Sequence, residues 1–359
     1  MKRVFIFGYY GFKNLGDEAI LSSIVKMIKE QDSRVEISAL SYNVKYTEST
    51  HKIKGVSRNS IFDILNAIRN SDLVISGGGT LLQDTTSSRS LIYYLAIINI
   101  AKLFKKPVLF FCNGFGPIKK SFNKFLARKV TNKVDRIVLR DPKSKVVMEE
   151  MGITNPSDVT VDAAFYLDGV GSKRIKEILE NESIPVDKPI IGISVRPWSV
   201  GESFVSTMGK FADYIANKGL TVVFIPMQPV KDDEVSEAIM GRMEKKSYIL
   251  KSQYTPEEVL GIIGALDILV AMRLHALIFA GIKEVPMIGL EYDPKVDAFL
   301  KMVSQRNGGK VEELDFLNLC IEFDNLWNKR AEEKEKLINI RENLEEMVQR
   351  NKDILSKML

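Results

Sequence analysis

Cysteine and histidine are scarce in this chain of 359 residues, which holds only two of each. Cys112 and Cys320 lie in different halves of the sequence, which argues against a disulfide scaffold and against a cysteine zinc site. The two histidines, His51 and His275, are too few for a histidine-rich metal site. We therefore expect no metal and no cofactor, and any imidazole chemistry has to use one of these two side chains.

Long apolar runs are also missing. Nowhere do about 18 apolar residues follow one another, so no membrane-spanning helix is expected. The start of the chain superficially resembles a signal peptide, but the apolar run Val4–Phe7 is too short and Asp17-Glu18 follow closely. We interpret this run as a buried first strand and expect a cytoplasmic protein.

The balance of charge is only mildly basic, since 51 Lys and Arg against 46 Asp and Glu leave +5. This charge suits an anionic substrate or an anionic surface and does not require nucleic acid as a partner. The composition is 45% apolar and 27% charged, which is ordinary for a globular protein and argues against disorder. The length suggests two domains.

Short apolar runs rich in β-branched residues alternate with helical stretches through both halves of the chain. This alternation predicts an α/β protein with two doubly wound, Rossmann-like parallel sheets. We place an N-terminal domain at 1–168, a polar linker at 169–188, and a C-terminal domain at 189–323. Ligands of such sheets bind at the carboxyl ends of the strands, so two facing domains would form a cleft.

The tail at 324–359 has a different pattern, because Leu337, Ile340, Leu344 and Met347 recur at helical spacing between Lys and Glu. We expect a long amphipathic helix. Its apolar stripe could pack on the domains, pair with another helix in a coiled coil, or leave its lysines to contact a membrane surface.

The first strand runs into a glycine-bearing turn, Gly8–Ala19, that also contains Asn14. Its glycines fit neither the dinucleotide fingerprint nor a P-loop. Asp17 lies where the next helix begins. It either caps that helix and complements the helix dipole, or it accepts the proton of a hydroxyl group.

Two further glycine-bearing segments follow predicted strands. The triplet Gly77, Gly78 and Gly79 could form a backbone nest open to a ligand, or a tight turn under a closely packed helix. The run Asn113–Pro117 follows the next strand. We expect both segments to be loops on the acceptor side of the site.

Basic side chains also follow strands. These residues are Arg140, Arg196, Arg273 and Lys295. Arginine in such a place suits phosphate or carboxylate. The alternatives are an ion pair of Arg140 with Asp141 or a neighbouring loop, and a solvated Lys295.

His275 follows Arg273 at a strand-to-helix junction, where a nearby bound anion would favour its protonated form. Such a histidine can act as a proton donor, or it can simply cap the helix or fill the core. We place His51 in a polar surface loop.

Five motifs occur in order that together resemble the polysaccharide pyruvyl transferase family. They are Gly8–Gly11 with Asn14–Ala19, Ser76–Gly79, Asn113–Pro117, Arg140-Asp141 and Arg273–Ala276. The resemblance covers roughly residues 1–300 and is closest to the CsaB-type enzymes of bacterial cell-wall polymer synthesis. It implies a two-domain fold like that of the GT-B glycosyltransferases.

The resemblance also implies the reaction. A pyruvyl group would pass from phosphoenolpyruvate to two hydroxyls of a sugar, giving a cyclic ketal and free phosphate. The acceptor would be similar to a lipid-linked β-N-acetylmannosamine unit of a secondary wall polymer whose ketal anchors surface-layer proteins. The family's donor-binding arginine, histidine and lysine correspond to Arg140, His275 and Lys295. A protein at the inner face of the membrane is compatible with this acceptor, as are a peripheral membrane contact and a homo-oligomer.

The alternative interpretation is an enzyme with the same fold that catalyses a different reaction. A glycosyltransferase or sugar-nucleotide epimerase of the same fold would use a UDP-sugar, and fold alone does not separate these reactions. The second half lacks an acidic residue placed to bind a ribose. A binding module without activity would have no reason to gather Arg, His and Lys at strand ends. The acceptor sugar, the ring positions and stereochemistry of the ketal, the general base, the oligomeric state and the role of the tail stay open.

Overall fold

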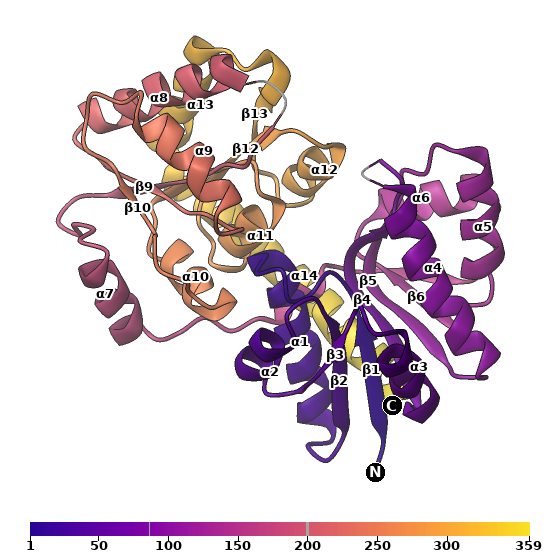
Figure 1. Ribbon diagram of the computed structural model, residues 1–359. Helices are drawn as coiled ribbons and strands as arrows, with labels where there is room; N and C mark the ends of the chain where they lie inside the picture. The colour runs from indigo at the N-terminus through magenta and orange to yellow at the C-terminus, as the bar shows by residue number, and fades with distance from the viewer. Residues whose placement is uncertain (86, 199–200) are drawn as a thin grey trace. The chain divides into compact units, whose positions relative to one another are not determined.

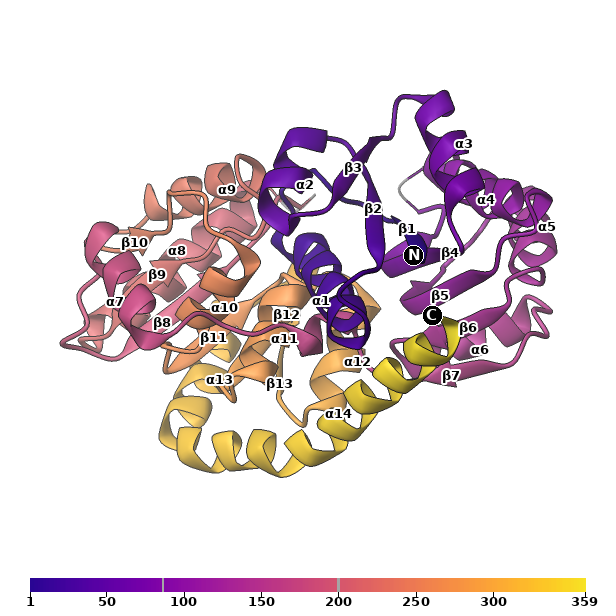
Figure 2. The same ribbon diagram turned by 90° about the horizontal axis from the view of Figure 1, so that it is seen from below.

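A computed structural model describes residues 1–85, 87–198 and 201–359. The chain forms two compact units (Figures 1 and 2). Unit 1 consists of Met1–Leu167 with Leu344–Leu359, and unit 2 consists of Asp168–Asn343. Each unit is built on its own parallel sheet, so the predicted fold class of two doubly wound α/β sheets is confirmed.

The sheet of unit 1 has seven strands in the order β3-β2-β1-β4-β5-β6-β7. The strands are β1 (Arg3–Phe7), β2 (Glu36–Ser41), β3 (Lys54–Ser57), β4 (Leu73–Leu82), β5 (Val108–Phe115), β6 (Arg136–Leu139) and β7 (Ser157–Val159). The helices are α1 (Leu15–Gln31), α2 (Val44–His51), α3 (Ile61–Asn70), α4 (Ser88–Leu103), α5 (Ser121–Thr131) and α6 (Pro142–Glu150), with a 3₁₀ turn η1 at Ala163–Tyr166.

Continuous apolar strands fill the centre of this unit, because both faces of the sheet are covered. Helices α3, α4 and α5 share one buried apolar cluster with the strands, and α1 lies on the opposite face (Figure 2). Helix α1 begins at Leu15 because the Asn14 side chain accepts a hydrogen bond from the Gly16 amide, an N-cap.

The glycine triplet is not a loop. Strand β4 runs through Gly77–Gly79 to Leu82, and β5 runs through Asn113 to Phe115. Gly78 and Gly79 have φ of +64° and +67°, and the pairing between β4 and β5 shifts its register after Gly79. A Cβ at Gly78 would come within 2.5 Å of the Ile20 side chain. Glycine is required here because α1 packs so closely against a kinked strand.

The sheet of unit 2 has six strands in the order β10-β9-β8-β11-β12-β13. The strands are β8 (Ile190–Ser194), β9 (Thr221–Phe224), β10 (Tyr248–Ile249), β11 (Ile268–Ala271), β12 (Met287–Glu291) and β13 (Arg306–Lys310). The helices are α7 (Ser172–Asn181), α8 (Gly201–Asn217), α9 (Lys231–Met240), α10 (Pro256–Ile263), α11 (Leu274–Ile282), α12 (Pro294–Met302), α13 (Phe316–Asn328) and α14 (Arg330–Met358), with a 3₁₀ turn η2 at Val311–Glu313.

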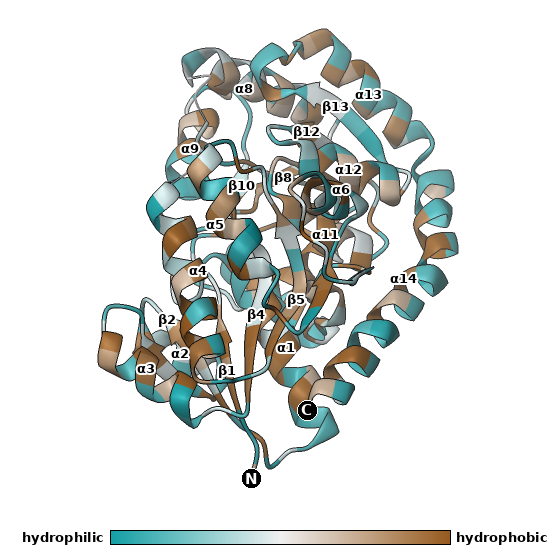
Figure 3. Ribbon diagram, turned by 90° about the vertical axis from the view of Figure 1, so that its right-hand side faces the viewer, coloured by the Kyte–Doolittle hydropathy of each residue, from teal (hydrophilic) through white to brown (hydrophobic). Residues whose placement is uncertain are grey.

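The segments predicted as a linker and as a tail are both helical in the structure. The segment 169–188 contains helix α7, which packs on α10 within unit 2 and brings Ile175 against Gly261. The expected long C-terminal helix is confirmed as α14, along which polar and apolar residues alternate (Figure 3), and the first residues of the predicted tail form the end of α13. From Leu344 onward α14 belongs to unit 1, where the Asn351 amide donates to the Val161 carbonyl at 3.2 Å.

Within the described ranges, no helix is both long and apolar enough to cross a bilayer.

Candidate active site

In unit 1, strands β1, β4, β5 and β6 are neighbours in the sheet. Of the expected site residues, Gly77–Gly79 and Asn113 lie in these strands, Arg140 directly follows β6, and Asp17 is in the first turn of α1, the helix after β1. Because all the strands are parallel, their carboxyl ends meet at one edge, and this edge is where ligands of such sheets bind. We call it the unit 1 edge.

A buried carboxylate shapes the first turn of this edge. Glu18 accepts a hydrogen bond from the Gly11 amide at 2.9 Å, and its other oxygen lies 2.9 Å from Nε2 of His51. Both side chains are fully buried, and Nδ1 of His51 lies 3.2 Å from the Ser22 hydroxyl. The expectation that His51 lies at the surface is therefore wrong. The polar residues around it in sequence form helix α2, which turns His51 inward to meet Glu18.

Asp17 lies one residue before Glu18 and is half-buried. One of its carboxylate oxygens would lie 3.4 Å from a Cβ built on Gly79. Asp17 thus faces the kinked part of β4. Burial is the main cause that raises the pKa of the Tyr10 phenol, and the nearby carboxylate of Asp17 raises that pKa further.

Asn113 carries an oxygen that is available for a ligand. The side chain is 3% exposed, and its amide nitrogen donates to the Gly78 carbonyl at 2.9 Å. Its Oδ1 is buried and has no hydrogen-bond partner among the residues that the structure describes. A buried acceptor without a donor is costly, so this oxygen is suited to accept a hydrogen bond from a bound hydroxyl.

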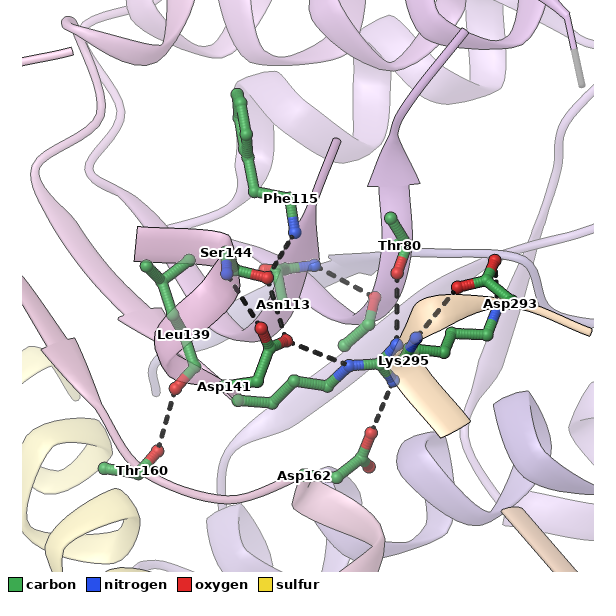
Figure 4. Close-up of polar contacts among 12 residues, drawn as sticks. Thr80, Asn113, Phe115, Leu139, Asp141, Ser144, Thr160, Asp162, Asp293 and Lys295 are labelled. Atoms are coloured by element: carbon green, nitrogen blue, oxygen red, sulfur yellow. Dashed lines mark hydrogen bonds and ion pairs between the residues drawn. The ribbon is translucent and has the colours of Figure 1, made fainter. Parts of the chain in front are cut away.

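Arg140 is 8% exposed and contacts Thr80, Asp141 and Asp162, which are labelled in Figure 4. Nη1 donates to Asp162 at 2.7 Å, and Nη2 donates to the Thr80 hydroxyl at 3.1 Å. Burial disfavours the charged guanidinium, but Asp162 and Asp141 outweigh this effect and raise the pKa of Arg140. The ion pairs expected as the alternative role are present. Two hydrogen bonds still leave further N–H groups of the guanidinium that could meet an anion.

The sequence did not indicate that Thr80 and Asp162 contact Arg140. Asp162 follows Arg140 by 22 residues and stands just after the edge strand β7, so no spacing rule connects the two. The only available signal was topological, since the residues after β6 and β7 lie at the same end of the sheet.

Three aromatic rings form a stack beside the first turn of the unit 1 edge. The Tyr9 and Phe12 centroids are 4.0 Å apart with planes 4° from parallel, and Phe12 and Tyr42 are 4.5 Å apart at 15°. The Arg58 guanidinium lies 5.1 Å from the Phe12 centroid. Tyr42 is 59% exposed, so the stack reaches the surface.

In unit 2, strands β8, β11 and β12 are neighbours, and each is followed by a predicted site residue. Arg196 follows β8, Arg273 and His275 follow β11, and Lys295 follows β12. These residues share the carboxyl edge of the second sheet, which we call the unit 2 edge.

Arg273 is engaged in a buried ion pair. Its guanidinium donates to both oxygens of Asp232, with Nε at 2.9 Å, and the Asp232 side chain is fully buried. The same carboxylate accepts the amides of Met227 and Gln228 at 3.0 and 2.9 Å. Arg273 thus ties the turn after β9 to the start of α11, a role that the sequence did not reveal because Asp232 lies 41 residues away.

Arg196 and Lys295 flank one aromatic ring. The Arg196 guanidinium lies 4.9 Å and the Lys295 ammonium 5.4 Å from the Tyr292 centroid. Arg196 also lies 5.5 Å from the ring of Trp198, whose Nε1 donates to Glu312 at 2.7 Å. Burial raises the pKa of Tyr292, but Lys295 and Arg196 outweigh it, so the pKa falls below its ordinary value. The ring therefore lies in a positive local field.

His275 is the second residue of α11 and is half-buried. The N-cap position is Arg273, which makes no side-chain cap. The first backbone N–H groups of α11 point out of the helix end and favour an anion there. The side chain of Lys295 lies 3.5 Å from Asp293, so it is paired rather than simply solvated.

The chain is similar in sequence to known proteins of polysaccharide biosynthesis. Residues 14–294 match the family described as polysaccharide pyruvyl transferase. Among curated proteins, the amylovoran biosynthesis protein AmsJ of Erwinia amylovora is 22% identical over 254 residues, which is 66% of this chain. The match spans 60% of that relative's length.

The fold is shared with sugar-nucleotide enzymes. A UDP-GlcNAc 2-epimerase from Neisseria meningitidis bound to UDP-GlcNAc has a TM-score of 0.66 at 14% identity, covering 100% of this chain and 99% of its own. HepE of Anabaena in complex with UDP-glucose has a TM-score of 0.64 at 12% identity over 99% and 100%. A glycosyltransferase from Rickettsia africae has a TM-score of 0.63 at 15% identity over 99% and 98%. These identities establish a common fold and nothing finer.

Proposed function

Because the chain belongs to the polysaccharide pyruvyl transferase family, we propose that it transfers a pyruvyl group from phosphoenolpyruvate to two hydroxyls of a sugar. The observation that best supports this donor is the positive field at the unit 2 edge, where Arg196 and Lys295 flank Tyr292. Phosphoenolpyruvate carries a phosphate and a carboxylate, so its site must supply more than one cation.

The donor is held by groups of the unit 2 edge. Lys295 binds the carboxylate, and the N-terminal amides of α11 with His275 bind the phosphate. Arg196 supplies further positive charge, and its planar group stacked on Tyr292 is oriented for a planar carboxylate or a phosphate. Arg273 holds α11 in place through Asp232. The assignment of Arg140 to the phosphate stays a prediction.

His275 is the general acid of this scheme. In its protonated form it gives a proton to the methylene carbon of phosphoenolpyruvate, which becomes the methyl group and leaves an oxocarbenium-like centre at C2. One sugar hydroxyl adds to C2, and the second then displaces phosphate, which departs with the bridging oxygen. Of the two hydroxyl protons, the first is taken up by Asp17 and passes on to the departing phosphate, and the second restores His275.

The acceptor is held by groups of the unit 1 edge. Asp17 accepts the proton of the attacking hydroxyl, and Asn113 Oδ1 accepts a hydrogen bond from the sugar. The Tyr9–Phe12–Tyr42 stack offers an apolar ring surface of the kind that pairs with the face of a sugar. A lipid-linked β-N-acetylmannosamine unit of a cell-wall polymer is the acceptor we favour, because of the resemblance to CsaB-type enzymes.

The second candidate is a glycosyltransferase or epimerase acting on a UDP-sugar. It is favoured by the solved structures of the same fold, since two of them are complexes with UDP-GlcNAc or UDP-glucose. The positive groups of the unit 2 edge would then hold a diphosphate.

One experiment separates the two candidates. The purified protein is given an N-acetylmannosaminyl acceptor with either phosphoenolpyruvate or a UDP-sugar, and release of phosphate and of nucleotide is measured. We expect phosphate release that depends on the acceptor and that falls sharply in Lys295→Ala. The matched control Lys283→Ala removes a lysine at the far end of α11, remote from the unit 2 edge, and should leave the rate of phosphate release unchanged. Nucleotide release without phosphate release would support the second candidate.

A further inference from the structure

One stretch of the chain has a charge unlike the rest. Between Asp84 and Asp135 the sequence contains ten Lys and Arg and no Asp or Glu. The stretch therefore carries +10, and since the whole chain carries +5, the remainder sums to 5 − 10 = −5. A charge asymmetry of this size within one chain points to an anionic partner.

The structure gathers these residues on one side of unit 1. Helices α4 and α5 lie side by side (Figure 1), joined by Asn123 Nδ2 to Ser88 Oγ at 3.0 Å near their starts and by Lys133 Nζ to Asn99 Oδ1 at 2.8 Å. We call their outer surface the basic face. In the described part of the chain, the one ion pair made by these ten cations is Lys102 with Asp135 at 2.6 Å. Most of the positive charge is therefore not neutralised.

Large apolar side chains project between these cations. The exposed fractions are 43% for Ile92, 72% for Leu103, 40% for Phe104, 65% for Phe122 and 51% for Phe125. Lys129 lies 6.0 Å from the Phe125 ring, so a cation and an exposed aromatic side chain are close together on this face. Exposed apolar groups gathered on one face mark an interaction site.

A hollow of about 470 Å³ lies at one border of the basic face. Its lining combines the cations Lys124 and Arg128 with the apolar side chains of Phe125, Val147 and Met151, and it also includes Glu150. A lining that combines cations with apolar side chains suits a bound molecule that is anionic at one end and apolar at the other.

We propose that the basic face binds the surface of a bilayer containing anionic lipids. Lys and Arg beside Phe, Leu and Ile on the outside of helices are the composition of surfaces that lie in the headgroup region. A second copy of this chain would place positive charge on positive charge. Nucleic acid would satisfy the cations but would leave Ile92 and Leu103 without an apolar environment.

The face is coupled to the unit 1 edge by one buried carboxylate. Asp84, in the connection after β4, accepts the amides of Lys119 and Lys120 at 2.7 and 3.0 Å and the Asn123 side chain at 2.8 Å. The connections that lead from β4 and β5 into the two helices are thereby fixed to each other. If the acceptor is lipid-linked, as in the proposed function, this face would hold the unit 1 edge near the membrane.

The test measures binding alone and needs no substrate. The full chain is mixed with vesicles of phosphatidylcholine, either pure or containing phosphatidylglycerol, and its co-sedimentation is measured at low and high salt. Each cation near an anionic surface strengthens binding about fivefold. We therefore expect the triple variant Lys124→Gln, Arg128→Gln, Lys129→Gln to bind anionic vesicles about a hundredfold more weakly.

A second variant tests the apolar part, and a third controls for net charge. Phe122→Ser with Phe125→Ser should weaken binding more than about tenfold, because two exposed rings lose their insertion. The matched control Lys173→Gln, Lys210→Gln, Lys334→Gln removes the same charge from exposed lysines of unit 2 and should bind like the parent. Circular dichroism of each variant verifies that it is folded.

Salt-sensitive retention on anionic vesicles that both basic-face variants lose, and the control keeps, would support the proposal. Three results would overturn it: no retention of the parent at low salt, equal loss in the control, or tighter binding to a short nucleic acid than to the vesicles. None of these results bears on phosphoenolpyruvate turnover with a water-soluble acceptor. Failure of the membrane proposal is therefore distinguishable from failure of the proposed reaction.

Discussion

The ion pair between Arg273 and Asp232 allows a test of how the unit 2 edge is held together. The substitution Asp232→Asn keeps the shape of the side chain and removes its charge. Asp232 is fully buried and the Arg273 side chain is 9% exposed, so the guanidinium would stay buried without a counter-charge. The new amide NH₂ would also face donors, because the carboxylate now accepts from Arg273 and from the Met227 and Gln228 amides.

Breaking a buried pair on one side costs about 3–5 kcal/mol. With a urea slope of about 2 kcal/mol per molar, the unfolding midpoint should fall by about 1.5–2.5 M. Both tryptophans of the chain, Trp198 and Trp327, lie in unit 2, so their fluorescence reports the unfolding of the affected unit.

A second substitution separates the effect of the lost ion pair from the effect of the buried, unpaired guanidinium. Replacing Arg273 by Met in the Asp232→Asn background removes the buried, unpaired guanidinium and should restore part of the lost stability. The coupling energy between Asp232 and Arg273 should be about 3 kcal/mol. A loss of less than about 1 kcal/mol in Asp232→Asn, or a double variant no more stable than that single variant, would show that the pair is not what orders the turn after β9.

Other predictions address the remaining parts of the site. His275→Ala should lower the rate of transfer about 10²–10⁴-fold in steady-state phosphate release, and near-normal turnover would remove its role as the acid. Lys295→Ala should raise the pKa of Tyr292 in an ultraviolet titration, because the positive charge of Lys295 helps to lower it against the effect of burial. Asn113→Ala should raise KM for the acceptor about tenfold with a smaller change in KM for phosphoenolpyruvate. Asp84→Asn should destabilise unit 1 by about 3 kcal/mol at neutral pH, because three hydrogen bonds to a charged acceptor are weakened. Burial opposes ionisation of Asp84, but the Lys120, Asn123 and Lys119 donors lower its folded pKa below the unfolded value. Its stabilisation is therefore fully present above about pH 4 and is lost as the pH falls through the folded pKa, so the difference between parent and variant in urea melts should shrink in acid.

The doubly wound fold was predictable because its strands are continuous apolar runs and its helices have a clear apolar face. Strand β3 and helix α2 were not predictable, since α2 buries only Thr47 and His51 and its neighbour β3 buries only Val56. The polar edge strand β13, with the sequence RNGGK, gives no alternation to detect. Short elements at sheet edges are decided by tertiary contacts rather than by local pattern.

For the site, topology alone placed the basic residues correctly at strand ends. The sequence did not reveal their partners, because Asp162 and Asp232 lie 22 and 41 residues from the arginines they neutralise. Nor did it reveal that His51 turns inward, because the pairing with Glu18 joins α2 to α1 across 33 residues. Long-range pairing of buried polar side chains has no signature in a single sequence.

Pyruvyl transfer by the proposed route would cleave the C–O bond of phosphoenolpyruvate and add a proton to its methylene carbon. The most direct measurement runs the reaction in D₂O with phosphoenolpyruvate carrying ¹⁸O in the bridging position, and analyses the products by NMR and mass spectrometry. We expect ¹⁸O in the released phosphate and a sugar ketal whose methyl group carries one deuterium. Free pyruvate that retains the ¹⁸O, or phosphate release with no ketal on the sugar, would contradict it.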